Sequence, residues 1–198
     1  PGWIVIFELG LTEMNPWTEA AVHVPPIEVI VYGYVVWVFK DNVWEIVPEI
    51  SITAQMVTRL RVRFGSKVLV YHSRFNNNER AEMWSKIIKN DINAKIILGA
   101  RSSIFLPFKN LGLIVVDEEH ESSFKQFDPS PRYHARDLAI YLGKILKIKT
   151  LLGSATPSAE SYNNMINGKY GYVELLVRYR GLKMPKISII DLKEEIRR

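Results

Sequence analysis

Three consecutive acidic residues follow an apolar run in the stretch LGLIVVDEEHESSFKQ, residues 111–126. The run predicts a buried strand, so Asp117, the first polar residue after it, should project from the strand end. An acid at such a place can hold Mg²⁺, usually through water, while the metal bridges nucleotide phosphates. Glu118 could then orient or deprotonate an attacking water, and His120 could hydrogen-bond to a neighbouring loop. The alternative is an acidic turn that only ends the strand and faces solvent.

A second polar loop, GSATPS, begins at Gly153 after the apolar residues of KTLL. Glycine permits a tight exit from a strand, and a proline suits the start of a following helix. The hydroxyls of Ser154 and Thr156, which flank Ala155, could donate hydrogen bonds toward the acidic loop. Alone this turn is a weak signal, but one strand after the acidic loop it points to a site shared by both.

The elements that must position these loops alternate along the chain. Short apolar runs predict strands at 67–71, 94–98, 111–116 and 149–153, and amphipathic spacing predicts helices at 51–64, 76–91, 132–147 and 158–168. Such alternation indicates an α/β fold with a parallel sheet covered on both faces. Because ligands bind at the carboxyl ends of such strands, the loops GARS (99–102), DEEH (117–120) and GSAT (153–156) should open onto the same edge.

The composition changes near Pro48. Four of the five tryptophans precede it, and the alternation in IEVIVYGYVVWVF predicts strands, with a hairpin that turns near Gly33. Residues 1–47 contain one lysine and six acidic residues, a net charge of −5, which leaves about +10 for residues 48–198 because the whole chain carries +5. A basic surplus of this size suits a polyanion such as nucleic acid, although a lysine-rich solvated surface is the alternative.

The bulk composition excludes several classes of protein. The chain has 198 residues and no cysteine, which excludes disulfides and cysteine-based zinc sites and makes a reducing, cytoplasmic setting the expectation. No apolar stretch reaches the length of a membrane span, and the start lacks the basic leader of a signal peptide, so no membrane partner is expected.

Five stretches together resemble the superfamily 2 helicases, and among them the PriA family of replication-restart helicases. They are PEISITAQM (48–56), VYHSRFNNNER (70–80), LGARSSIFLPFKNLGLIVVDEEHESSFKQ (98–126), PRYHARDLAIY (131–141) and LLGSATPSAESY (151–162). The similarity runs almost continuously from about Val47 to Asp191.

The resemblance implies a RecA-like three-layer α/β sandwich with a mainly parallel sheet, incomplete at its N-terminus. It implies a fragment of an ATP-dependent 3′–5′ DNA helicase that acts in replication restart and primosome assembly, with ATP and Mg²⁺ as cofactors and no zinc. Asp117 would contact Mg²⁺, Glu118 would be the catalytic base with His120 beside it, and 153–156 would couple hydrolysis to DNA movement. The implied partners are single-stranded or forked DNA, primosome proteins and the single-stranded-DNA-binding protein.

The resemblance also implies a set of DNA-facing residues. Phe124 and Tyr133 would stack on bases, and Lys125, Arg132 and Arg136 would contact phosphates or relay the DNA signal to the acids. The remaining residues that match DNA-facing motifs are Pro48, Glu49, Arg101, Ser102 and Gln126. The alternatives are that Phe124, Phe127 and Tyr133 anchor the loop on the core, and that Arg101 forms a surface ion pair.

One motif of the family is missing. A phosphate-binding loop, Gly-x-x-x-x-Gly-Lys-Ser/Thr, should precede residue 48, but the sequence EAAVHVPPIEVIVYGYVV has no Gly-Lys pair. We therefore expect residues 1–46 to be a β-rich segment foreign to the family, 47–177 a partial ATPase lobe, and 178–198 the start of a linker to an absent second lobe. The arginine finger and the cysteine-rich zinc module of the family are also expected to be absent. The isolated chain is predicted to lack ATPase activity. The alternatives are a non-catalytic module that binds single-stranded DNA and a non-functional gene fragment.

Overall fold

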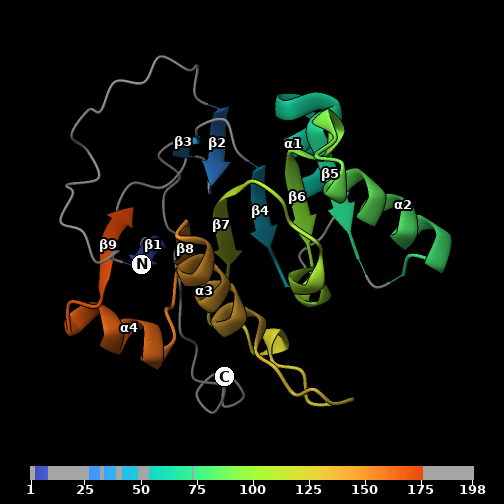
Figure 1. Ribbon diagram of the computed structural model, residues 1–198. Helices are drawn as coiled ribbons and strands as arrows, with labels where there is room; N and C mark the ends of the chain where they lie inside the picture. Colours follow the sequence, from blue (N-terminus) through green and yellow to red (C-terminus); the bar gives the residue numbers. More distant parts are fainter. Residues whose placement is uncertain are drawn as a thin grey trace, which may run out of the picture.

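The computed structural model describes residues 3–8, 27–31, 34–38, 42–48, 54–72 and 74–175. These residues form a seven-stranded sheet with strand order β5-β6-β4-β7-β8-β1-β9 and a separate hairpin, β2-β3 (Figure 1). The strands are β1 (Trp3–Glu8), β2 (Ile27–Val31), β3 (Tyr34–Val38), β4 (Asn42–Ile46), β5 (Val68–Tyr71), β6 (Ile96–Gly99), β7 (Leu111–Asp117), β8 (Lys149–Ser154) and β9 (Tyr170–Leu175). The helices are α1 (Ala54–Phe64), α2 (Asn77–Ile88), α3 (Ala135–Leu146) and α4 (Ala159–Ile166), with short 3-10 turns η2 (Gly65–Lys67), η3 (Ile92–Ala94), η4 (Arg101–Phe105) and η5 (Ser122–Phe124).

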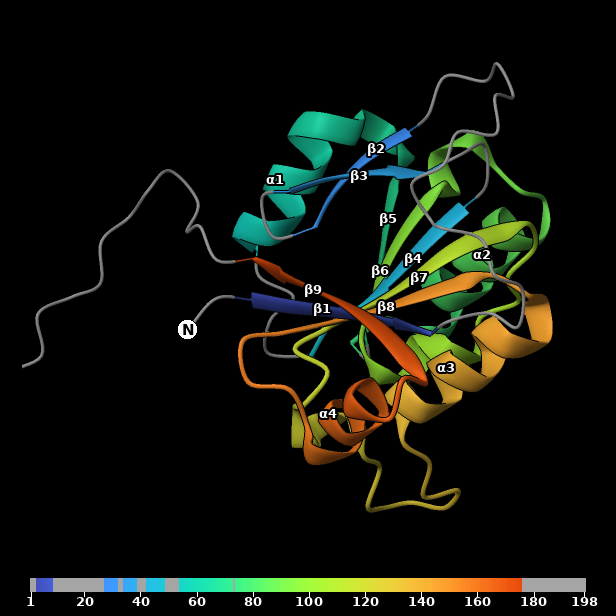
Figure 2. The same ribbon diagram turned by 90° about the vertical axis from the view of Figure 1, so that its left-hand side faces the viewer.

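Five neighbouring strands, β5, β6, β4, β7 and β8, run parallel to one another. The reversed strand β1 pairs antiparallel with both β8 and β9, so β9 runs in the common direction. Helix α1 and the β2-β3 hairpin lie on one side of the sheet, and α2 and α3 lie on the other (Figure 2). The predicted α/β fold with a mainly parallel sheet is therefore confirmed. No helix among the described residues is long and apolar enough to cross a membrane.

Strand β4, which precedes Pro48, is a central strand of the sheet. It lies between β6 and β7, with Val43 opposite Ile96 and Ile46 opposite Val116. Trp44 and Ile46 on this strand are fully buried. The expected boundary after residue 46 thus coincides with the end of a central strand, so residues 42–46 are part of the sheet and not of a separate segment.

The valine-rich run forms the predicted hairpin. Strands β2 and β3 pair antiparallel, with Val31 opposite Tyr34, and Gly33 between them lies outside the described residues. Branched and aromatic side chains favour such strands because they pack well on a pleated surface.

The core fills the space between the sheet and helices α2 and α3. Trp44, Ile97 and Ile114 on three neighbouring strands have no exposed surface, and they belong to one cluster with Met83 of α2 and Ala139 of α3. Burial of these apolar side chains is the main stabilising contribution, about 1.5–3 kcal/mol for each large residue.

The loop after β6 packs closely because Gly99 has no side chain. A Cβ atom at Gly99 would lie 2.3 Å from the Cβ of Ser103, a distance that real atoms do not reach. Ser103 is itself buried, where its hydroxyl donates to the carbonyl of Ala100 at 2.6 Å and accepts from the indole Nε1 of Trp44 at 3.1 Å. The glycine at the start of the GARS loop is therefore required by packing.

Helix boundaries follow local capping. Helix α2 begins after Asn76, whose side chain accepts from the amide of Glu79 at 3.0 Å while the Glu79 carboxylate accepts from the amide of Asn76 at 2.8 Å. Helix α3 begins at Ala135, three residues later than predicted, because His134 pairs with Lys125 in an isolated bridge. The candidate cap of the first helix, Ser51, lies outside the described residues.

Candidate functional site

The acidic loop and the GSAT loop leave neighbouring parallel strands at the same edge of the sheet. Asp117 at the end of β7 lies opposite Gly153 of β8 in the strand register. The amide of Glu119 continues this pairing by donating to the carbonyl of Gly153 at 3.0 Å. Since β4 and β6 run in the same direction, the loops that follow residues 46 and 99 open at this edge too. The predicted common edge is confirmed.

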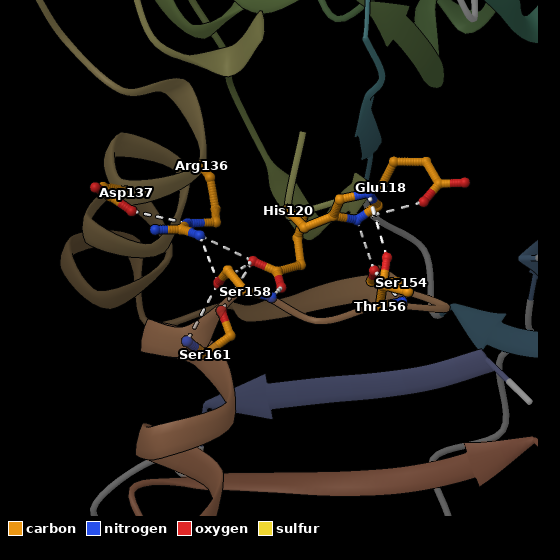
Figure 3. A network of polar contacts seen from close by, with 9 residues as sticks. Glu118, His120, Arg136, Asp137, Ser154, Thr156, Ser158 and Ser161 are labelled. Carbon is orange, nitrogen blue, oxygen red and sulfur yellow. Dashed lines mark hydrogen bonds and ion pairs between the residues drawn. The ribbon is translucent and has the colours of Figure 1, made fainter. Parts of the chain in front are cut away.

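The two loops contact each other through His120. Its Nδ1 lies 2.7 Å from the hydroxyl of Ser154, and its Nε2 lies 3.4 Å from the hydroxyl of Thr156 (Figure 3). The Ser154 hydroxyl also accepts from the amide of Thr156 at 2.9 Å. The predicted contact between the loops is therefore present, although the hydroxyls meet the imidazole and not the acids.

Glu118 adopts an unusual backbone conformation. Its φ is +50°, in the left-handed region, where a residue with a side chain is disfavoured by about 1–2 kcal/mol. Its carboxylate lies 3.6 Å from Nδ1 of His120. Partial burial raises the pKa of Glu118, His120 opposes the shift and Glu121 adds to it. A raised pKa makes this carboxylate a stronger base, which suits the predicted activation of water.

Glu119, between the two predicted catalytic residues, is an anchor that the sequence analysis did not assign. Its side chain is 1% exposed and accepts four hydrogen bonds. The donors are the amide of Ser158 at 2.6 Å, the hydroxyls of Ser158 and Ser161 at 3.0 and 2.9 Å, and Nη1 of Arg136 at 3.0 Å. Serine 158 also caps α4. In the sequence, Ser158 and Ser161 at the start of a predicted helix indicated a capping site. The sequence did not indicate that Glu119 would bind them, because that contact is set by the tertiary structure.

A second unassigned carboxyl, Glu45, lies next to the acidic loop. It stands on central strand β4, opposite Val115 of β7 and two residues before the level of Asp117. Burial raises its pKa to about 8, and the negative charge of Asp117 adds to the shift. Glutamate inside an otherwise apolar strand was the sequence signal for a perturbed group.

The chemistry of the donors fits Mg²⁺ only in part. Asp117 supplies a carboxylate, and Ser154 and Thr156 supply hydroxyl oxygens, which are the ligand type that Mg²⁺ prefers. Among the described residues no group of three or more His, Cys, Asp or Glu side chains could hold a metal, so water and phosphate oxygens would have to complete the shell. The 198 residues contain no Gly-Lys-Ser or Gly-Lys-Thr sequence that could cradle those phosphates, since the two Gly-Lys pairs, at 143–144 and 168–169, are followed by Ile145 and Tyr170. The chain therefore fits one metal-binding carboxylate but not a complete nucleotide site.

The predicted DNA-facing loops are joined to each other. Nη1 of Arg101, in the loop after β6, donates to the carbonyls of Ser123 and Lys125 at 3.2 and 3.0 Å. Tyr133 packs edge-on against Phe105 with ring centroids 5.0 Å apart. Arg101 thus holds the loop of residues 121–134 against η4 by donating to backbone carbonyls, which differs from the surface ion pair given as the alternative.

Phe124 does not occupy the place predicted for base stacking. Its side chain has no exposed surface and belongs to the hydrophobic core. Phe127 and Phe105 are the exposed aromatic residues of these loops, at 70% and 54% exposure. The stacking role predicted for Phe124 is therefore wrong because its ring fills the space below the loop, and the alternative that it anchors the loop describes it. Tyr133 is partly buried.

Other residues of the loop are bound within it. Nζ of Lys125 donates to the carbonyl of Arg132 at 2.7 Å, and Nε2 of Gln126 donates to the carbonyls of Pro129 and Pro131 at 2.6 and 3.2 Å. Arg136 is 7% exposed and pairs with Glu119 and Asp137. Direct phosphate contact by Arg136 is therefore wrong for this arrangement, because the guanidinium lies inside the network of Figure 3.

For the remaining predicted DNA-facing residues the structure gives burial alone or no description. Pro48 is buried just past β4, and Ser102 is partly buried in η4. Glu49 and the segments 1–2 and 176–198 lie outside the described residues. The predicted DNA contacts of these residues stay predictions.

The family model of the DEAD/DEAH box helicases matches residues 40–165, a range that takes in β4. The replication restart protein PriA of Bacillus subtilis is 46% identical over 152 residues, which cover 77% of this chain and 18% of that protein.

Further relatives give the same result. The replication restart protein PriA of Haemophilus influenzae is 46% identical over 150 residues, 76% of this chain and 20% of that protein. That of Synechocystis is 40% identical over 161 residues, 79% of this chain and 19% of that protein. The chain thus spans about a fifth of the length of the curated relatives that it matches.

Proposed function

The chain belongs to the DEAD/DEAH box helicase family, and on this premise we propose that it is part of the first motor lobe of a replication-restart helicase. The parent activity would be 3′–5′ unwinding of single-stranded or forked DNA in the cytoplasm, driven by ATP and Mg²⁺. Primosome proteins and the single-stranded-DNA-binding protein would be its partners. This chain would supply the acidic loop and the DNA-facing loops of that motor.

One observation carries the proposal. Parallel strands β7 and β8 bring the acidic loop and the GSAT loop to one edge, where His120 joins them at 2.7 Å from Ser154. A change in position of the acidic loop, caused by a ligand bound at Asp117 and Glu118, would be transmitted to Ser154 through this hydrogen bond. Such a connection is what a motor needs if hydrolysis is to move DNA.

Each group has a role that its position supports. Asp117 would bind Mg²⁺ together with nucleotide phosphates, and Glu118, with its raised pKa, would take a proton from water. His120 would hold the two loops in register, and bound ATP would supply the phosphoryl group.

Strand β1 reaches this edge of the sheet with its amino end, because Ile4 lies opposite Ser154. A reversed strand is unsuited to deliver a phosphate-binding loop here, because such loops follow the carboxyl end of a strand.

The predicted inactivity of the isolated chain is tested directly. Phosphate release from ATP is measured with and without single-stranded DNA, for the chain and for Asp117→Asn. We expect no turnover above background, because the lysine-bearing phosphate loop is missing. DNA-stimulated turnover that Asp117→Asn abolishes would show that the chain binds ATP without that loop.

The motor role is tested in a chimera. Residues 40–165 of this chain replace the matching region of the Bacillus subtilis relative, which leaves the rest of that protein intact. We expect DNA-stimulated ATPase activity that falls by at least about 100-fold on Asp117→Asn, in line with the loss of a metal-binding carboxylate. A folded chimera whose turnover ignores Asp117→Asn would refute the assignment of the acidic loop.

A second function, binding of single-stranded DNA without catalysis, is favoured by the exposed aromatic residues. Phe127 is 70% exposed in a loop that also carries Lys125 and Arg132. Aromatic and basic side chains of this kind bind bases and phosphates with little sequence preference.

The binding function has its own test. Fluorescence anisotropy with a labelled oligothymidylate measures affinity at several salt concentrations. We expect affinity to fall with salt and to drop about tenfold or more in Phe127→Ala, since stacking contributes about 1–3 kcal/mol per base. Tyr141→Ala, at an exposed aromatic residue of helix α3, is the matched control. Equal losses in both variants would count against stacking on Phe127.

A further inference from the structure

The acidic loop holds its two functional residues on either side of a buried anchor. Glu118 and His120 are partly exposed at the edge of the sheet, whereas the side chain of Glu119 turns into the protein and is 1% exposed. The left-handed backbone of Glu118, with φ +50°, is what allows this arrangement in three consecutive residues. Such a conformation persists only where neighbouring contacts hold it.

Those contacts converge on Glu119. Its amide is held by the carbonyl of Gly153 at 3.0 Å, and the amide of Glu121 donates to the carbonyl of Glu118 at 2.8 Å. Its carboxylate is held by Ser158 and Ser161 at the start of α4 and by Arg136 at the start of α3. The loop is thereby fixed to a strand and two helices at a single residue.

Arg136 fixes the orientation of the Glu119 carboxylate. Its Nη1 bridges the Glu119 carboxylate and the Ser158 hydroxyl at 3.0 and 2.7 Å, and its Nε donates to Asp137 at 2.9 Å. The N–H groups of a guanidinium point in fixed directions within one plane. Arg136 therefore restricts the position of the Glu119 carboxylate more than a single rotatable hydroxyl would. Figure 3 shows Arg136 reaching from α3 toward Ser158 and the acidic loop.

We propose that Glu119 and Arg136 are positioning residues, which hold Glu118 in its left-handed backbone and thereby aim Glu118 and His120 at the site. The polar groups of both side chains bind other residues of the protein. Their part in catalysis rests on the proposed function, but the positioning itself is a property of this chain and is measured without any ligand.

The test is nuclear magnetic resonance of the chain and of Glu119→Gln. The three-bond coupling between the amide and α protons of residue 118, read together with the strong nuclear Overhauser effect between these two protons at positive φ, reports its φ, and hydrogen exchange reports the stability of the loop. In Glu119→Gln we expect the coupling to lose its left-handed value and the His120 amide to exchange about tenfold faster, with exchange in β6 unchanged. Glu121→Gln, the same change two residues along the loop, should leave both readings as in the wild type.

Two further variants separate positioning from general stability. Arg136→Lys keeps the charge but loses the planar guanidinium, so both readings should change in the same direction as in Glu119→Gln and by a smaller amount. Glu118→Gly combined with Glu119→Gln should restore slow exchange at His120, because glycine adopts the left-handed conformation without steric cost. If Glu119→Gln fails to fold, Ser161→Ala, which removes one hydrogen bond to the carboxylate, should still speed exchange at His120 several-fold.

A folded Glu119→Gln chain, or in its place Ser161→Ala, with wild-type coupling at residue 118 and wild-type exchange at His120 would overturn the proposal. That result would leave the chimera and the DNA-binding experiments untouched. A failure of those experiments would in turn refute the motor role while leaving the positioning measured here in place.

Discussion

Glu45 makes the stability of this chain depend on pH in an unusual direction. Burial on strand β4 and the charge of Asp117 raise its pKa from 4.5 to about 8. The folded state therefore binds the proton more tightly than the unfolded state does. The resulting stabilisation is fully present below pH 4.5 and is lost as the pH rises through 8.

The size of the effect follows from the two pKa values. Each pKa unit corresponds to about 1.4 kcal/mol, so the full range amounts to about 5 kcal/mol. Between pH 5 and pH 7 the unfolded carboxyl ionises and the folded one stays mostly protonated, which lowers the free energy of unfolding by about 2–3 kcal/mol. This loss is a large share of the stability of an ordinary domain.

The assay is urea unfolding of the wild type and Glu45→Gln at half-unit steps from pH 5 to pH 8. Glutamine keeps the shape but does not titrate, so we expect Glu45→Gln to be more stable than the wild type at pH 7 by about 2–3 kcal/mol, and similar at pH 5. Glu174→Gln, at an exposed position on β9, is the control that should show no such divergence. If the difference between wild type and Glu45→Gln stayed constant from pH 5 to 8, the reasoning would be refuted.

Three other substitutions, with Phe127→Ala as a control, test the packing and the helix capping, each by urea unfolding at fixed pH. Gly99→Ala should lower the free energy of unfolding by about 2 kcal/mol or more, because its Cβ overlaps Ser103; a change under 0.5 kcal/mol would contradict the close approach. Phe124→Ala should cost about 3–5 kcal/mol, whereas Phe127→Ala, at an exposed ring, should stay within about 0.5 kcal/mol, and similar losses in both would argue against the observed burial. Asn76→Ala should cost about 1 kcal/mol through loss of the capping box, and an unchanged midpoint would show that α2 does not depend on it.

Backbone elements were predicted more fully than the positions of side chains. The alternation of apolar runs with amphipathic helices predicted the sheet direction, and with it the common edge for the loops after residues 116 and 152. This succeeded because strand direction follows from connection type, a local property. The place of residues 42–46 in the sheet was not predicted, because one short strand gives no sign of which neighbours it will pair with.

Aromatic and charged residues of the loops were harder to place. A phenylalanine in a polar loop can face the core or solvent, and Phe124 and Phe127 differ in this although they lie three residues apart. The resemblance gave Arg136 either a phosphate contact or a relay to the acids, and its partner Glu119, 17 residues away in the chain, could not be predicted from the sequence. Whether a charge is solvated or paired depends on contacts distant in sequence.

By itself the sequence determined the order of the elements between residues 51 and 168 and the identity of the groups at the site, since the apolar periods and the DEEH and GSAT motifs are local. Only the tertiary structure decided which acid is buried, how Glu118 is turned and where Glu45 meets Asp117. The reason is physical: burial and pKa depend on every atom packed around a group, and those atoms come from β4, β7, β8, α3 and α4 together.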